Sequence, residues 1–221
     1  MTSSQNKPRN LALIAVASIA LICFIGILCS RSLFEATNLA VNAWIPTIQT
    51  QTLTPIAQAV NVLDTNVFLV ITLPVAGYLF IRKEAKYSLM LLCVMGADAL
   101  ILQALKMGVA SPRPLNARIF EGDYSFPSGH LTSVLVLLGM LTYIIYQTNK
   151  PAFKALAVAT PVLGVLMAFD RLYLNIHWVS DVIAAPFLAL FIVTLTIVII
   201  ESLAGWQQKK CHTIPLAAGE K

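Results

Sequence analysis

The chain has 221 residues, of which 58% are hydrophobic and only 11% are charged. A soluble domain carries roughly 25% charged residues, so this composition, with a mean hydropathy of +0.79, excludes a water-soluble globular protein and predicts one solvated by the bilayer. The net charge of +5 does not indicate a nucleic-acid partner, because the cations follow membrane topology, as described below.

The first predicted element is a membrane-spanning helix over residues 11–29, a stretch without a charge. Lys7 and Arg9 precede it, as they would in a signal peptide, but a signal h-region has only about 7–15 residues. Neither Cys23 nor Cys29 follows the small residue that a lipoprotein cleavage site needs. We therefore expect a retained first span, preceded by a cytoplasmic N-terminus at residues 1–10.

Residues 30–66 are too polar to span the membrane, because their Leu, Val, Ile and Ala residues alternate with Asn, Gln and Thr. Pro46 and Pro55 also interrupt this segment. One or two short helices in the membrane interface fit the pattern best. A loop folded over the bundle is the alternative.

Five further apolar segments follow, each long enough for a short or a full span. The first of them ends at the charged run 82–86, the next carries a single charge, Asp98, and the last three are uncharged. No internal repeat argues for an inverted-repeat transporter. The chain is thus predicted to be all-α, with six transmembrane helices within residues 11–205 and the later spans at residues 67–81, 87–105, 131–146, 155–169 and 182–200.

The distribution of lysine and arginine predicts the orientation. Six spans put both termini on one side, together with ten of the fifteen cations. The positive-inside rule makes that side the cytoplasm, so the tail at residues 206–221 is cytoplasmic and the protein is a multi-pass protein of the cytoplasmic (inner) membrane. The other five cations lie on the outer, periplasmic or extracellular side: Arg31, Lys106, Arg113, Arg118 and Arg171.

Three polar segments are expected to meet on the outer face. Residues 106–114 follow the third span, residues 126–130 (F-P-S-G-H) open the fourth, and residues 171–181 join the fifth to the sixth. Six spans place them at one depth, although they lie far apart in the sequence. Together they supply three cations, two histidines, a carboxylate and a Ser-Gly turn at the start of a helix.

These residue types predict a site for a tetrahedral anion. Lys106, Arg113 and Arg171 can surround a dianion, because the guanidinium fork matches phosphate oxygens. Ser128 is placed as an N-cap, which leaves the backbone N–H groups of Gly129 and the next residue aimed at an anion.

Two histidines can supply the chemistry. His177 and Asp181 are four residues apart, so on a helical turn the carboxylate can accept a hydrogen bond from one ring N–H. The other ring nitrogen of His177 is then free to attack an electrophile. His130 can protonate the departing oxygen.

The patterns K-x6-RP, PSGH and R-x5-H-x3-D, in this order, resemble the three-part signature of the type 2 phosphatidic acid phosphatase superfamily. The resemblance covers residues 106–181 well and the six-helix layout generally, and the first third of the chain is similar only in topology. It implies that His177 forms a phosphohistidine that water hydrolyses, that Asp181 orients His177, and that His130 is the general acid. It also implies a set of groups that bind the phosphoryl group and stabilise its transition state: Lys106, Arg113, Ser128, Gly129 and Arg171.

Two carboxylates do not follow directly from this signature. The family usually has Ser before the arginine of its third motif, and this chain has Asp170. A carboxylate there either braces a neighbouring cation or weakens anion binding. Asp98 lies mid-span, eight residues before Lys106 on roughly the same helix face, and we expect it to face the bundle interior below the phosphate site, bonded to polar neighbours.

No cofactor and no metal are expected, because fixed cations take the place of a metal at the phosphate. The four cysteines lack C-x-x-C spacing, so they predict neither a disulfide framework nor a zinc site. The expected partners are the lipid bilayer and a lipid phosphate substrate, with no nucleic acid and no obligate protein partner.

The predicted function is removal of a phosphate from a membrane lipid. The motif loops are short, and lipid can enter the mouth of a helix bundle from the side. Family and length favour an isoprenoid diphosphate such as undecaprenyl diphosphate. The alternatives are a phosphatase for phosphatidylglycerophosphate, phosphatidate or lipid A, and a lipid phosphotransferase. A transporter would need more polar spans, and the family's haloperoxidases are expected to be soluble.

Overall fold

The computed structural model describes residues 3–62, 65–148 and 150–213, and these residues form helices without any strand. The all-α prediction is therefore confirmed. Along the chain the elements are α1 (Ser3–Cys29), the 3-10 turn η1 (Arg31–Phe34), α2 (Glu35–Ile48), α3 (Leu53–Val60), α4 (Thr65–Ile81), α5 (Ala85–Val109), α6 (Gly129–Thr148), α7 (Lys150–Tyr173) and α8 (Val179–Thr213).

Each of the six apolar segments lies within a helix, as predicted, and the six helices differ in length. Five helices are long and apolar enough to cross a membrane: α1, α5, α6, α7 and α8. The sixth, α4, has 17 residues and contains Pro74. At 1.5 Å per residue it is about 26 Å long, slightly less than the roughly 30 Å of a hydrocarbon core.

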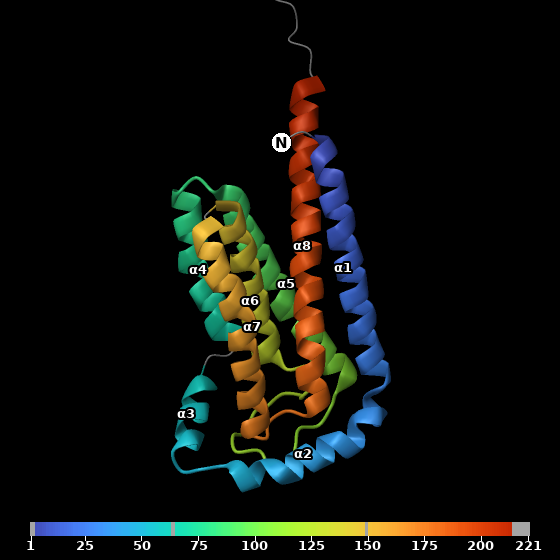
Figure 1. The fold of residues 1–221 in the computed structure, drawn as a ribbon, viewed down its shortest axis with the longest axis vertical. Coiled ribbons are helices and arrows are strands. Elements are labelled where there is room, and N and C mark those ends of the chain that lie inside the picture. The colour runs from blue at the N-terminus through green and yellow to red at the C-terminus, as the bar shows by residue number, and fades with distance from the viewer. Residues whose placement is uncertain (1–2, 63–64, 149, 214–221) are drawn as a thin grey trace, which may run out of the picture.

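The long helices form a bundle with α6 near its centre. α6 packs against α5, α7 and α8, while α1 packs along α8 and α4 along α5. α6 and α7 approach closely at Gly164, where a Cβ would lie only 2.7 Å from Leu135 Cδ2. The N-terminal end of α1 and the C-terminal end of α8 lie at one end of the bundle, and α2 crosses the opposite end (Figure 1).

The core is apolar, and so is the outside. Met90, Leu91 and Val94 lie on one face of α5 and are completely buried, as their helical spacing predicts. By contrast, Ile19 and Ile22 on α1 are more than 60% exposed. Exposed aliphatic side chains all along a helix are typical of a protein whose solvent is hydrocarbon.

The described residues 30–62 contain the short helices η1, α2 and α3, as predicted, and the alternative of a loop is wrong. α2 carries Asn38 and Asn42 one turn apart. Asn38 Nδ2 donates to Ser180 Oγ (3.3 Å), and Asn42 Nδ2 donates to Asn175 Oδ1 (2.7 Å). Beneath α2 and α3, Tyr173 belongs to a small second apolar cluster. These two helices thus cover the loops that carry the motif residues.

The two ends of the chain are more helical than expected. α1 begins at Ser3, within the predicted N-terminal segment 1–10, and α8 continues to Thr213, within the predicted tail 206–221. Residues 1–2 and 214–221 lie outside the described residues, and so does Lys221, one of the cations used for orientation.

Candidate active site

Helix ends bring the three motif segments together at the end of the bundle that α2 crosses (Figure 1). α5 ends because Ala110 adopts a left-handed conformation (φ 47°), and its N–H donates to the Lys106 carbonyl. Lys106 and Arg171 therefore lie in the last turns of α5 and α7, and Asp181 lies in the first turn of α8.

His177 lies between the carboxylate of Asp181 and the guanidinium of Arg113. Its side chain is fully buried, and Nδ1 lies 3.3 Å from Asp181 Oδ2. The Trp178 N–H donates to the same carboxylate oxygen (2.9 Å), which fixes the carboxylate. On the other side of the ring, Nε2 lies 3.2 Å from Arg113 Nη1. The expected contact of His177 with Asp181 is thus present, and Nε2 faces the cations.

The surroundings of His177 keep its imidazole neutral. Burial lowers the pKa of His177 well below the usual 6.5, and the charges of Arg113, Lys106 and Arg171 lower it further. A neutral imidazole is the nucleophilic form. With Nδ1–H directed at Asp181, the lone pair lies on Nε2.

Arg113 joins two loops. Its Nη1 donates to the Ile176 carbonyl (2.8 Å), next to His177, and its Nε donates to the Asp123 carbonyl (3.0 Å). The guanidinium therefore fixes the loop that carries His177, and its Nη2 remains directed at carboxylate oxygens of residues 121 and 123.

Arg171 is completely buried and braced by its neighbour. Nε donates to Asp170 Oδ2 (3.0 Å), and Nη2 pairs with the same oxygen. Nη1 donates to Asn61 Oδ1 (2.5 Å) and lies 4.0 Å from Glu121 Oε1. The contact expected if Asp170 braces a neighbouring cation is thus present.

The PSGH segment opens α6 at Gly129, so Ser128 holds the N-cap position, as predicted. Its N–H donates to the Asp181 carbonyl (3.3 Å). Its hydroxyl is buried and has no hydrogen-bond partner within the described residues. His130 Nε2 lies 3.1 Å from the Asn61 carbonyl oxygen. A buried hydroxyl without a partner is costly, and it could donate to a bound anion.

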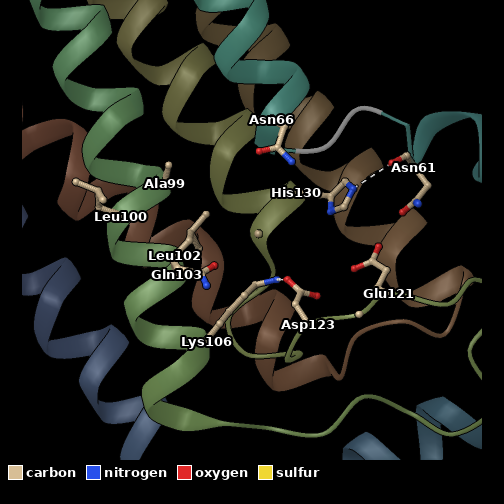
Figure 2. A pocket seen from close by; sticks show the side chains of 12 residues that line it. Asn61, Asn66, Ala99, Leu100, Leu102, Gln103, Lys106, Glu121, Asp123 and His130 are labelled. Carbon is tan, nitrogen blue, oxygen red and sulfur yellow. Dashed lines mark hydrogen bonds and ion pairs between the residues drawn. The ribbon is translucent and has the colours of Figure 1, made fainter.

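A cavity of about 600 Å³ opens beside these residues. Figure 2 shows Lys106 and Gln103 projecting from α5, His130 from α6, and Asn66 from the start of α4. The acidic side chains of residues 121 and 123 also line it. Among the described residues, no group of three or more His, Cys, Asp or Glu side chains is arranged to hold a metal ion.

Two unpredicted carboxylates contact all three cations. Asp123 pairs with Lys106 Nζ and with Arg113 Nη2. Glu121 Oε2 lies 2.5 Å from Arg113 Nη2, and its Oε1 faces Arg171. Burial raises the pKa of Asp123, but hydrogen bonds and charge from Lys106 and Arg113 outweigh burial and hold that pKa below its usual value.

Asp98 faces the bundle interior, as expected. It is completely buried, and Ser133 Oγ donates to its Oδ2 (2.6 Å). Eight residues along α5 separate it from Lys106, about 12 Å of helix. Asp98 does not line the cavity, so its observed contact links α5 to α6.

Among the residues that contact the predicted set, Asn61, Glu121 and Asp123 were not expected from the sequence. The two acids lie between the first and second motifs, on the predicted outer side. This position predicts that they lie near the motif residues, but it does not predict which residues they contact. Asn61 ends α3 and has no sequence signal that relates it to His130 or Arg171.

The sequence is similar to that of known proteins of one family. The sequence profile of the PAP2 superfamily matches residues 87–203. The chain is 32% identical over 139 residues to phosphatidylglycerophosphatase B of Bacillus subtilis (strain 168), covering 61% of this chain and 68% of that protein. It is 29% identical over 133 residues to an undecaprenyl-diphosphatase of Sulfolobus acidocaldarius, covering 57% and 61%.

Two solved structures have the same fold. One is a transmembrane PAP2 type phosphatidylglycerolphosphate phosphatase from Bacillus subtilis, with a TM-score of 0.76 and 20% identity over 87% of this chain and 96% of that one. The other is LpxE from Aquifex aeolicus, with a TM-score of 0.54 and 19% identity over 73% and 94%. At these identities the likeness concerns the fold alone.

Proposed function

The chain belongs to the PAP2 superfamily and is a multi-pass membrane phosphatase, and from this premise we propose that it removes a phosphate from a lipid headgroup with His177 as the nucleophile. One observation carries the assignment. The His177 ring lies between Asp181, 3.3 Å from Nδ1, and Arg113, 3.2 Å from Nε2. The imidazole is therefore oriented by a carboxylate and directed toward the cations.

In the first step, His177 Nε2 attacks phosphorus, and the bond from phosphorus to the lipid oxygen breaks. The product is a phosphohistidine and a free lipid alcohol or lipid phosphate. The ring becomes positively charged as the bond to phosphorus forms. Asp181 accepts the Nδ1–H hydrogen bond and stabilises this charge, as the aspartate does in a Ser-His-Asp triad.

The phosphoryl oxygens are bound by fixed positive groups. Lys106, Arg113 and Arg171 Nη1 supply charge, and the buried Ser128 hydroxyl and the Gly129 N–H at the start of α6 supply hydrogen bonds. In phosphoryl transfer, positioning and electrostatic stabilisation supply most of the catalysis. Donors that are already in place therefore lower the barrier.

His130 gives a proton to the departing lipid oxygen. Its ring lines the same cavity as Lys106 (Figure 2) and is held there by the Asn61 carbonyl, 3.1 Å from Nε2. In the second step a water molecule takes the place of the leaving group. His130 accepts a proton from this water, which attacks the phosphohistidine and releases inorganic phosphate.

An apolar hollow supports a lipid as the substrate. It measures about 550 Å³ and is lined by aliphatic and aromatic side chains of α3, α4, α6 and α7, with Asp170 at its edge. Asp170 contacts Arg171. A hydrocarbon chain in this hollow would therefore bring its headgroup to the cations, and burial of the chain would favour binding.

Within the lipid class, undecaprenyl diphosphate is the first candidate and phosphatidylglycerophosphate the second. The relative from Sulfolobus is named for the first activity and the relative from Bacillus for the second. Three cations in one site suit the higher negative charge of a diphosphate.

We place the protein in the cytoplasmic (inner) membrane with the site on the periplasmic or extracellular face. The support is the distribution of cations, ten of which fall on the side of both termini. In this orientation residues 1–10 and 206–221 are cytoplasmic, and the phosphatase domain is formed by residues 11–205.

A substrate panel tests this proposal. Purified full-length protein in detergent is assayed for phosphate release from undecaprenyl diphosphate, phosphatidylglycerophosphate, phosphatidate and lipid A, with excess EDTA and no acceptor lipid. We expect the highest kcat/KM for undecaprenyl diphosphate and full activity in EDTA. Release of phosphate from none of these lipids would overturn a hydrolase, and release only after an acceptor lipid is added would identify a phosphotransferase. His177→Ala is the control for contaminating phosphatases.

A further inference from the structure

The acidic segment Glu121-Gly122-Asp123 contacts the cations of the proposed phosphate site. Asp123 pairs with Lys106 and Arg113, and Glu121 pairs with Arg113 and faces Arg171. One short segment thus contacts all three cations that are proposed to bind phosphate. A phosphoryl group can take its place there only by displacing two carboxylates.

The segment fits the three cations loosely. Glu121 Oε1 is buried without a hydrogen-bond partner in the described residues, and it lies 4.0 Å from Arg171 Nη1. The Asp123 side chain is 49% exposed. A planar carboxylate has two oxygens in one plane, whereas a tetrahedral phosphate presents oxygens in several directions. An incoming phosphate can therefore reach the three cations in place of the two carboxylates.

The charge of Asp123 persists at physiological pH. Lys106 and Arg113 hold the pKa of Asp123 below its usual value, despite the opposing effect of burial. The Asp123 carboxylate therefore stays charged to a lower pH than an ordinary aspartate does.

We propose that Glu121 and Asp123 act as an internal competitor for phosphate: they leave the cations when a lipid phosphate binds, and they return to displace the inorganic phosphate that remains after hydrolysis. This inference rests on the proposed function. A lipid phosphate is also held by its hydrocarbon chain, so it overcomes the competition. Inorganic phosphate has no such anchor, so it is released.

A different role would change phosphate binding in the opposite direction. If the two carboxylates only held Lys106, Arg113 and Arg171 in position for an anion, removal of the carboxylates would weaken phosphate binding. If they compete with phosphate, removal strengthens it. The sign of the change in the dissociation constant therefore decides between the two roles.

The experiment compares Glu121→Gln, Asp123→Asn and the double variant with the parent protein. The dissociation constant of inorganic phosphate is measured by titration calorimetry on full-length protein in detergent, and its inhibition constant is measured in the lipid assay. We expect Glu121→Gln to tighten phosphate binding roughly tenfold. Asp123→Asn should give a smaller gain, because an exposed ion pair is weaker. Glu35→Gln, an exposed acid on α2, should leave both constants unchanged.

The outcomes separate this inference from the proposed function. Tighter phosphate binding in the acidic-segment variants, including binding that becomes detectable only in them, supports the competitor role. Unchanged or weaker binding, in variants that still hydrolyse the lipid, overturns it. If no form of the protein binds phosphate or hydrolyses a lipid phosphate, the proposed function fails and this inference with it. Asp123→Asn changes a half-exposed side chain, so it keeps the test available even if Glu121→Gln is unstable.

Discussion

Two histidines in different surroundings carry the proposed chemistry at the residue scale. His177 is fully buried between Asp181 and Arg113, while His130 lines the cavity. A nucleophile benefits from a neutral ring in a fixed orientation. A proton donor needs access to the departing oxygen. The positions of the two rings suit these separate roles.

The pH dependence follows from the lowered pKa of His177. Because burial and three nearby cations lower this pKa well below 6.5, the nucleophilic form persists when the pH falls through 6.5. We expect no loss of kcat/KM near pH 6.5 from this group, since kcat/KM reports the free enzyme. Arg113→Gln removes one of those cations, so its remaining activity should decline at a higher pH than that of Arg113→Lys.

The same shift affects stability. In the unfolded chain the side chain of His177 binds a proton near pH 6.5, whereas in the folded protein it does so only at lower pH. Acidification through this window therefore favours the unfolded chain, and the melting temperature should decrease there.

The activity prediction has its own contradicting outcome. A kcat/KM that declines through the ordinary histidine range in the parent protein, and equally in both Arg113 variants, would contradict the lowered pKa of His177.

His130→Ala should reduce kcat by roughly 10²- to 10⁴-fold if His130 is the general acid. The loss should be smaller for an aryl phosphate, because its leaving group needs no proton. The measurement is kcat, together with kcat/KM, for a lipid phosphate and for p-nitrophenyl phosphate in parent and variant, because kcat/KM reports the first step and not the water step that both substrates share. Equal losses of kcat/KM on both substrates would exclude proton donation and point to a structural effect of the substitution.

The residues of the site could be predicted only in part. His177, Asp181 and Arg113 belong to motifs whose order and spacing are visible in the sequence, and helix count predicts their common side. The contacts of Glu121 and Asn61 depend on how residues 110–128 and the end of α3 fold back over the bundle. No local sequence pattern predicts how these loops fold, so these contacts could not be predicted.

At the scale of elements, helix ends determine the site and α2 with α3 cover it. Asn38 and Asn42 of α2 bond to the loop and helix around His177. Asn175 itself has φ 57°, a left-handed conformation that asparagine tolerates better than most residues. The loop before His177 is thus positioned by a helix from a distant part of the chain.

The apolar hollow gives a prediction about α7. Leu163 lines the hollow, so Leu163→Trp should fill part of it and obstruct the hydrocarbon chain. We expect KM for a long-chain lipid phosphate to rise roughly three- to tenfold, with kcat/KM for p-nitrophenyl phosphate unchanged. Val158→Trp is the control, because Val158 is exposed on the same helix outside the hollow. Equal effects of both tryptophans would refute a chain-binding role for the hollow.

Helices could be predicted more fully than their ends. The apolar segments of α5, α6 and α7 are visible in composition alone, because a span must be apolar throughout. The helical continuation of α8 to Thr213 could not be predicted from hydropathy, since residues 206–213 are mostly polar. Helix α4 is the sixth apolar helix of the predicted layout. It is shorter than the five helices that are long enough to cross a membrane.

For the whole molecule, the two ends of the bundle differ in composition. One end carries the N-terminal end of α1, the C-terminal end of α8 and the α4–α5 turn, which contains Arg82 and Lys83. The other end carries α2, α3 and the three motif segments (Figure 1). This asymmetry is the physical basis for the proposed orientation.

Cysteine labelling tests the orientation. In a cysteine-free background, Leu115→Cys places a thiol at a fully exposed position in the segment between α5 and α6. Lys83→Cys places one in the α4–α5 turn. A membrane-impermeant maleimide should label residue 115 in intact cells and residue 83 only after permeabilisation. The reverse pattern would place the site in the cytoplasm.

The central claim is that His177 forms a covalent bond to the phosphoryl group, and rapid-quench trapping tests it most directly. Full-length protein is mixed with lipid that carries a radiolabelled terminal phosphate and quenched in alkali, which preserves phosphohistidine. We predict labelled protein with the label on His177 in the parent and in His212→Ala. His177→Ala should show no labelled protein and a turnover lower by several orders of magnitude. Labelled protein, or near-parental turnover, in His177→Ala would contradict the assignment of His177 as the nucleophile.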